Sequence, residues 1–104
     1  MNFGLSEKSI STIHKIFQKY QEIEQALIFG SRAKGNYKEG SDIDLTLIGK
    51  NLTTNDLLYI ASDLEDSNLP YLFDLSIFAN IDNENLREHI NRIGSVFYER
   101  SKSK

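Results

Sequence analysis

Two acidic residues, Asp42 and Asp44, flank Ile43 at the start of an apolar run that continues to Ile48. Residues i and i+2 of a strand share a face, so the two carboxylates are expected to lie a few ångströms apart. Like charges that close together are unfavourable unless a cation lies between them. Oxygen ligands suit a hard divalent cation such as Mg²⁺. The alternative interpretation is a strand whose polar side chains simply face solvent.

Asp74 is the third candidate metal ligand. It lies inside residues 72–78, a segment that otherwise has the composition of a buried strand. A buried carboxylate is costly unless it is paired or bound to metal. If this strand neighbours the strand of Asp44, three carboxylates converge, enough to hold two Mg²⁺ ions about 4 Å apart. The alternatives are a solvent-facing edge strand or an ion pair with a basic residue such as Arg32.

A candidate phosphate-binding turn precedes the acidic residues. The apolar run 26–29 ends at Gly30 and Ser31, and we expect a short helix over 31–35 with Ser31 as its N-cap. Free N–H groups at such a turn bind anions, and glycine allows close approach. The Ser31 hydroxyl could bond a phosphate oxygen, and Arg32 could add positive charge. The alternative is an ordinary helix cap beside a solvated basic loop.

The remaining patterns predict the elements that carry these residues. Helical spacing and capping residues indicate helices over 6–20 and 53–66 and a last helix that begins after Asn83. Strands are expected over 26–29, 42–48 and 71–79. The fold class is therefore α/β, with a small mixed sheet of three strands flanked by helices. The last helix is expected to turn these apolar residues inward: Leu86, Ile90, Ile93 and Phe97.

Composition limits the classes of protein to consider. The 104 residues suit a single domain over 1–104. A net charge of −3 argues against direct nucleic-acid binding, because no basic excess exists to neutralise phosphates. No cysteine is present, and no apolar run approaches the ~20 residues of a membrane span. We therefore expect a cytoplasmic protein with no membrane partner.

The spacing of the two candidate motifs is their most specific property. Gly30-Ser31, ten intervening residues and Asp42-Ile43-Asp44 match the signature Gly-Ser-x(10)-Asp-x-Asp. The chain thereby resembles the minimal nucleotidyltransferases of the DNA polymerase beta superfamily, and the resemblance extends over its whole length. It implies a fold like the polymerase beta palm, built from little more than one α/β unit.

The resemblance also implies a role for each matching residue. Gly30 and Ser31 would hold the triphosphate of ATP, while Asp42 and Asp44 would ligate two Mg²⁺ ions. Asp74 would ligate the catalytic ion and help to deprotonate the attacking hydroxyl. The expected nucleotide-binding set is completed by two further residues of the same segment, Arg32 and Ser41.

Small members of this family commonly pair with a helical HEPN-domain protein. The resemblance implies transfer of AMP from ATP to a hydroxyl, a tyrosine, of such a partner, with this chain acting as the antitoxin of a HEPN ribonuclease toxin. Two alternatives stay open at this point. The chain could be a non-catalytic module that masks a HEPN-type partner by contact, or it could transfer the nucleotide to a small molecule.

Overall fold

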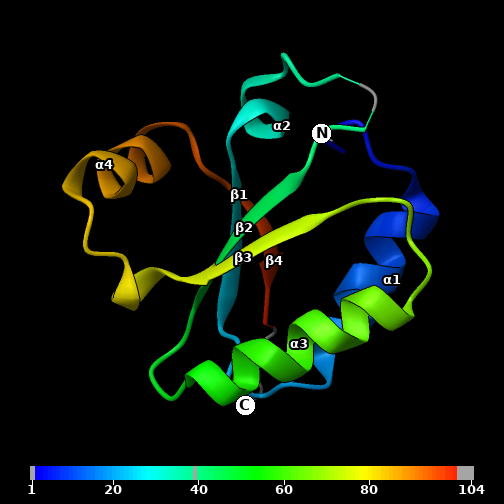
Figure 1. Cartoon of the computed structure of the whole chain (residues 1–104), viewed down its shortest axis with the longest axis horizontal. Coiled ribbons are helices and arrows are strands. Elements are labelled where there is room, and N and C mark those ends of the chain that lie inside the picture. The colour runs from blue at the N-terminus through cyan, green and yellow to red at the C-terminus, as the bar shows by residue number, and fades with distance from the viewer. Residues whose placement is uncertain (1, 39, 101–104) are drawn as a thin grey trace.

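The fold is a mixed four-stranded sheet with helices on both faces (Figure 1). The structure is a computed structural model that describes residues 2–38 and 40–100. The strands lie in the order β3-β2-β1-β4. Their bounds are Gln25–Phe29 for β1, Ile43–Ile48 for β2, Phe73–Ile77 for β3 and Ser95–Glu99 for β4.

Strand direction brings distant acidic residues to the same row of the sheet. The central strand β1 pairs antiparallel with β2 and with β4, whereas β2 and β3 are parallel. In this register Phe29 lies opposite Asp44, and Asp44 lies opposite Asp74. Residues opposite one another in a sheet project to the same face, so Asp44 and Asp74 share a face.

The other face of the sheet carries the main hydrophobic core. Helices α1 (Glu7–Gln18) and α3 (Thr54–Asp66) lie side by side over it. The core includes fully buried side chains from both layers, among them Phe17, Ile28, Leu45 and Ile60. Both helices begin at the capping residues that the sequence indicates. The Ser6 hydroxyl accepts from the amide of Ser9, and a complete capping box forms at Thr53.

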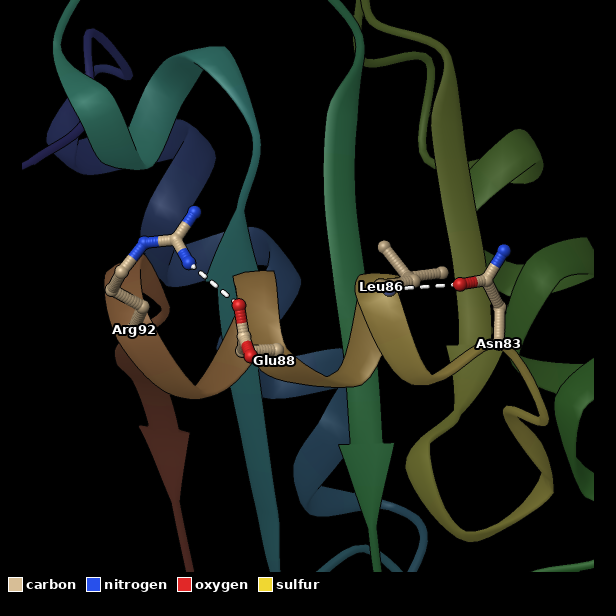
Figure 2. A network of polar contacts seen from close by, with 4 residues as sticks. All are labelled: Asn83, Leu86, Glu88 and Arg92. Carbon is tan, nitrogen blue, oxygen red and sulfur yellow. Dashed lines mark hydrogen bonds and ion pairs between the residues drawn. The ribbon is translucent and has the colours of Figure 1, made fainter.

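Helix α4 (Glu84–Ile93) crosses the face on which Asp44 lies (Figure 2). The Asn83 side chain caps it by accepting from the Leu86 amide at 3.1 Å, and an exposed Glu88–Arg92 ion pair of 3.1 Å joins successive turns. A single 3-10 turn, Phe78–Asn80, links β3 to this helix region. Among the described residues, no helix is sufficiently long and apolar to span a membrane.

The structure corrects the expected C-terminal region. The last helix ends at Ile93, and residues 95–99 form β4 as a fourth strand, so the predicted three-stranded sheet is one strand too small. Gly94 takes an extended conformation at the break (φ −63°, ψ 144°). Phe97 is buried as expected, but it is buried as a strand residue, and its helical spacing from Ile93 is coincidental. Strand β3 is also shorter than the predicted 71–79.

Candidate functional site

Gly30 ends β1 and begins the short helix α2, Ser31–Lys34. Its backbone has φ 74° and ψ −152°, a conformation that is essentially restricted to glycine. Gly30 is the N-cap of α2 and provides no side-chain cap, so the prediction that Ser31 caps this helix is wrong. Ser31 is instead the first helical residue, and its hydroxyl is not needed to cap the helix.

The absent side chain of Gly30 leaves space for the Asp44 carboxylate. A Cβ built on Gly30 would collide with Oδ2 of Asp44, which is the nearest atom to that position. The turn after β1 and the acidic strand β2 are therefore in contact at these two residues. A phosphate bound at the turn and a cation bound at Asp44 would be immediate neighbours.

Electrostatics at Asp44 are unfavourable to its charged form. Partial burial raises the pKa of this carboxyl above its ordinary value, and the negative charges of Asp74 and Asp42 raise it further. The nearby His89 acts in the opposite direction on this pKa. Asp42 itself is exposed and lies just before the first residue of β2. Asp42 and Asp74 thus both act on the charge of Asp44, at one end of β2.

The donor chemistry of this cluster fits Mg²⁺. Within residues 2–38 and 40–100, no three His, Cys, Asp or Glu side chains lie close enough together to form a metal cage of protein ligands. Mg²⁺ is commonly held without such a cage, by one or two carboxylates together with phosphate oxygens of the substrate. The neighbouring carboxylates of Asp44 and Asp74, beside a candidate phosphate turn, suit that mode of binding.

The face of the sheet that carries Asp44 and Asp74 differs in one respect from the expectation. Asp74 was expected to be buried, but its side chain is exposed because β3 is an edge strand. The case for Asp74 therefore rests on its register with Asp44 and not on burial. Thr46 shares this face, yet it is completely buried and its hydroxyl lies 3.5 Å from the Ser76 carbonyl. The face is therefore only partly open to solvent.

Arg32 and Ser41, the two other residues expected to bind the nucleotide, are hydrogen-bonded to one another and to nearby backbone. Arg32 is only 3 % exposed, and its guanidinium donates to the carbonyls of Ser41 and Phe3. The Ser41 hydroxyl accepts from the Lys38 amide at 2.8 Å, which closes the turn before Asp42. Both polar groups thus hold backbone in this structure, and their role as nucleotide ligands stays a prediction.

His89 belongs to the surroundings of the site, although the sequence did not assign it a role. It lies on α4, and its ring packs edge-on against Phe29, with centroids 6.3 Å apart. Phe29 is opposite Asp44 in the sheet, which explains the influence of His89 on that carboxyl. The available signal was its spacing of three residues from Leu86, on the apolar side of an amphipathic helix.

The sequence matches a known protein family over most of its length. The model of the family described as Polymerase beta, Nucleotidyltransferase matches residues 11–103. The chain belongs to this family. That range contains the Gly30–Ser31 turn and all three acidic residues of the site. The four-stranded mixed sheet with its flanking helices is the fold of these nucleotidyltransferases.

Named relatives are similar over most of the chain. A protein of Haemophilus influenzae described as "Probable protein adenylyltransferase MntA" is 29% identical, over 95% of this chain and 87% of its own length. A crystal structure described as a toxin-antitoxin with AMP-PNP has a TM-score of 0.72 at 19% identity, covering 88% of this chain and 73% of that one.

A second solved structure has the same fold. It is described as a tri-AMPylated HEPN toxin of Shewanella oneidensis in complex with its MNT antitoxin. The TM-score is 0.68 at 16% identity, and the match covers 92% of this chain and 74% of that one. At these identities the structural matches establish the fold alone.

Proposed function

We propose that this chain transfers AMP from ATP to a tyrosine hydroxyl of a HEPN-domain partner and acts as the antitoxin of a HEPN ribonuclease. The observation that carries the proposal is the register of Asp44 with Asp74 beside the Gly30 turn. The description of the Haemophilus influenzae relative as a probable protein adenylyltransferase supports the acceptor class. The HEPN toxin named in a structurally similar complex supports the partner.

Each polar group of the site then has a separate task. Backbone N–H groups after Gly30 and the hydroxyl of Ser31 bind the triphosphate. Asp42, Asp44 and Asp74 would hold two Mg²⁺ ions, together with phosphate oxygens. When bound, Mg²⁺ would neutralise the charge that develops on the transferred and leaving phosphates. The repulsion that raises the pKa of Asp44 would then be offset, because cations favour ionised carboxylates.

The reaction is an in-line substitution at the α-phosphorus of ATP. The acceptor oxygen forms the new bond to phosphorus, and the bond from phosphorus to the oxygen that bridges the α- and β-phosphates breaks. Pyrophosphate leaves with that electron pair. We assign the acceptor proton to Asp74, whose carboxylate is exposed at the edge of the sheet and is therefore accessible to a side chain of another protein.

The partner would also complete the site. Asp42 and Asp74 are both exposed, so the described residues leave the acidic side of the site accessible to a partner protein. We therefore expect the isolated chain to bind ATP weakly and to label itself little. A HEPN-type partner would supply both the acceptor tyrosine and a second wall for the nucleotide.

The proposal is tested by label transfer. The chain is incubated with ATP labelled at the α-phosphate, Mg²⁺ and a candidate HEPN-domain partner, and both proteins are then separated. Label on the partner that requires Mg²⁺ supports the proposal, and a partner variant lacking the acceptor tyrosines controls for the site of attachment. Label that appears only on small hydroxyl compounds would instead indicate a small-molecule acceptor.

A further inference from the structure

Arg32 is a buried charged residue, with only 3 % of its surface exposed. It follows Ser31 directly in α2. Burial of a charge is expensive unless hydrogen bonds and favourable contacts replace its water. The hydrogen bonds and contacts of this guanidinium therefore indicate the role of the residue.

The polar edge of the guanidinium is used to bind backbone. Nε and Nη2 donate to the Ser41 carbonyl at 3.2 and 2.9 Å, and Nη1 donates to the Phe3 carbonyl at 3.0 Å. This fork geometry is specific to arginine, because a lysine ammonium is a single point charge. One side chain thereby connects α2, the N-terminal turn and the loop that leads into β2.

The guanidinium also lies over the faces of two aromatic rings. The carbon Cζ lies 5.3 Å from the centroid of Tyr37 and 5.2 Å from the centroid of Tyr71. Both distances are within the range of attractive cation–π contacts. Tyr37 belongs to the loop before Asp42, and Tyr71 precedes β3. The contacts of Arg32 therefore reach the segments that lead to both acidic strands.

We propose that Arg32 is a positioning residue, which fixes the acidic residues of β2 and β3 relative to the Gly30–Ser31 turn and does not bind the triphosphate. Ser41, which it holds by the carbonyl, is bonded directly to Asp42 in the chain. The inference rests on the proposed function, and it changes the role that the sequence alone suggests for this arginine.

A direct phosphate contact would require Arg32 to leave this environment. Its hydrogen bonds to two carbonyls and its contacts with two rings would be lost together. The carbonyls of Phe3 and Ser41, which are buried and partly buried, would then need new partners. One charged contact with a phosphate does not offset the loss of all of these interactions. Each hydrogen bond from a charged donor contributes about 1.5 to 3 kcal/mol, and each cation–π contact adds about 0.5 to 1 kcal/mol.

The test separates positioning from phosphate binding by a KM-against-kcat comparison. The variants are Arg32→Lys, which keeps the charge but not the fork, and Tyr37→Leu, which removes one aromatic face from a partly exposed position. Positioning predicts that both lower kcat for partner labelling at least 10-fold, while KM for ATP changes less than 3-fold. The matched control is Lys34→Gln, an exposed charge on the same helix, which should leave kcat within 2-fold.

The opposite pattern would overturn the inference. If Arg32 binds the triphosphate, Arg32→Lys should retain most of kcat, Tyr37→Leu should behave like wild type, and Arg32→Gln should raise KM for ATP 10-fold or more. Circular dichroism first establishes that each variant is folded. If Arg32→Lys does not fold, Tyr37→Leu alone decides between the two patterns.

A second measurement stays informative if wild-type protein labels no partner. The affinity of the protein for Mn²⁺ alone is measured from the signal of the free ion in electron paramagnetic resonance. Positioning predicts at least 5-fold weaker Mn²⁺ binding in Arg32→Lys and Tyr37→Leu and unchanged binding in Lys34→Gln. Equal affinities in wild type and all variants would overturn the role of Arg32, whereas absence of label in wild type would contradict the proposed function only.

Discussion

The backbone of Gly30 lies directly against the carboxylate of Asp44, so that a methyl group at residue 30 would collide with Oδ2. This contact joins the turn after β1 to the acidic strand β2. Gly30 also has a positive φ of 74°, which alanine tolerates poorly. Any larger residue at position 30 would therefore clash with Asp44 and would also have to adopt an unfavourable backbone conformation.

Gly30→Ala should lower the free energy of unfolding by about 2 to 3 kcal/mol and should abolish AMP transfer. Urea unfolding measures the first effect. The control is Gly35→Ala, because Gly35 also has a positive φ (86°) but has open space around its missing Cβ. That variant should lose about 1 kcal/mol and keep its activity. Equal losses of stability in the two variants would contradict the importance of the contact with Asp44.

Asp44→Asn should raise the free energy of unfolding at pH 7 by about 0.5 kcal/mol, the scale of a cross-strand pair. The pKa of Asp44 is raised in the folded state, so its ionised form disfavours folding at neutral pH. The stability that protonated Asp44 provides is present below the ordinary pKa of 3.8 and is lost as pH rises through the folded pKa. The difference between variant and wild type should therefore shrink as pH falls towards 3.8. A difference that is constant with pH would refute this account.

Ser31→Ala should lower kcat/KM for ATP by an amount equivalent to about 1 to 2 kcal/mol, because one hydrogen bond to a charged phosphate is lost. It should change stability little, because Gly30 and not Ser31 is the N-cap of α2. Kinetics at varied ATP and thermal unfolding provide the two readings. Ser62→Ala, at an exposed position of α3, is the matched control. A drop in thermal stability with unchanged kinetics would show that Ser31 is structural.

Tyr20→Phe should destabilise the protein by about 1.5 kcal/mol, because it removes a hydrogen bond to the charged Asp63. It should not affect AMP transfer. Burial and this hydrogen bond raise the pKa of Tyr20 to about 12. The stabilisation is complete below pH 10 and is lost as pH rises towards 12. Urea unfolding between these values should show wild type converging on the variant. Tyr59→Phe, at a ring that is 66% exposed, should leave stability unchanged at neutral pH.

Much of the site geometry follows from local sequence signals. The Gly30 turn, the strand around Asp44 and the capping box at Thr53 were predicted from residues near in the chain, and the structure has each of them. Such features depend on backbone preferences and on short-range hydrogen bonds. For this reason, a single sequence is sufficient to locate them.

Features that depend on tertiary contacts could not be predicted in the same way. The fourth strand was missed because Phe97 continues the helical spacing of α4, although only the pairing with β1 decides its conformation. The exposure of Asp74 depends on β3 being an edge strand. Arg32 reaches a carbonyl of Phe3, 29 residues away in the chain, and no local pattern indicates such a contact.

Asp74→Asn, compared with loss of a negative charge elsewhere on the surface, tests the role of the third acidic residue. This variant should lower AMP transfer at least 100-fold, because it removes both a proposed metal ligand and the proton acceptor, two effects that each reach this size. Asp66→Asn removes the same charge at an exposed position of α3, on the opposite side of the sheet, and should retain full activity. Similar losses in both variants would remove the reason for assigning Asp74 to the site.

The most direct test of the account is the intact mass of the HEPN-type partner after incubation with this chain, ATP and Mg²⁺. We expect the mass of the partner to increase by one or more AMP units. This increase should be lost with Asp74→Asn and kept with Asp66→Asn. A partner that is bound and silenced by the wild-type chain with no change in mass would contradict catalysis. In that case the chain would be an inhibitory module that acts by contact.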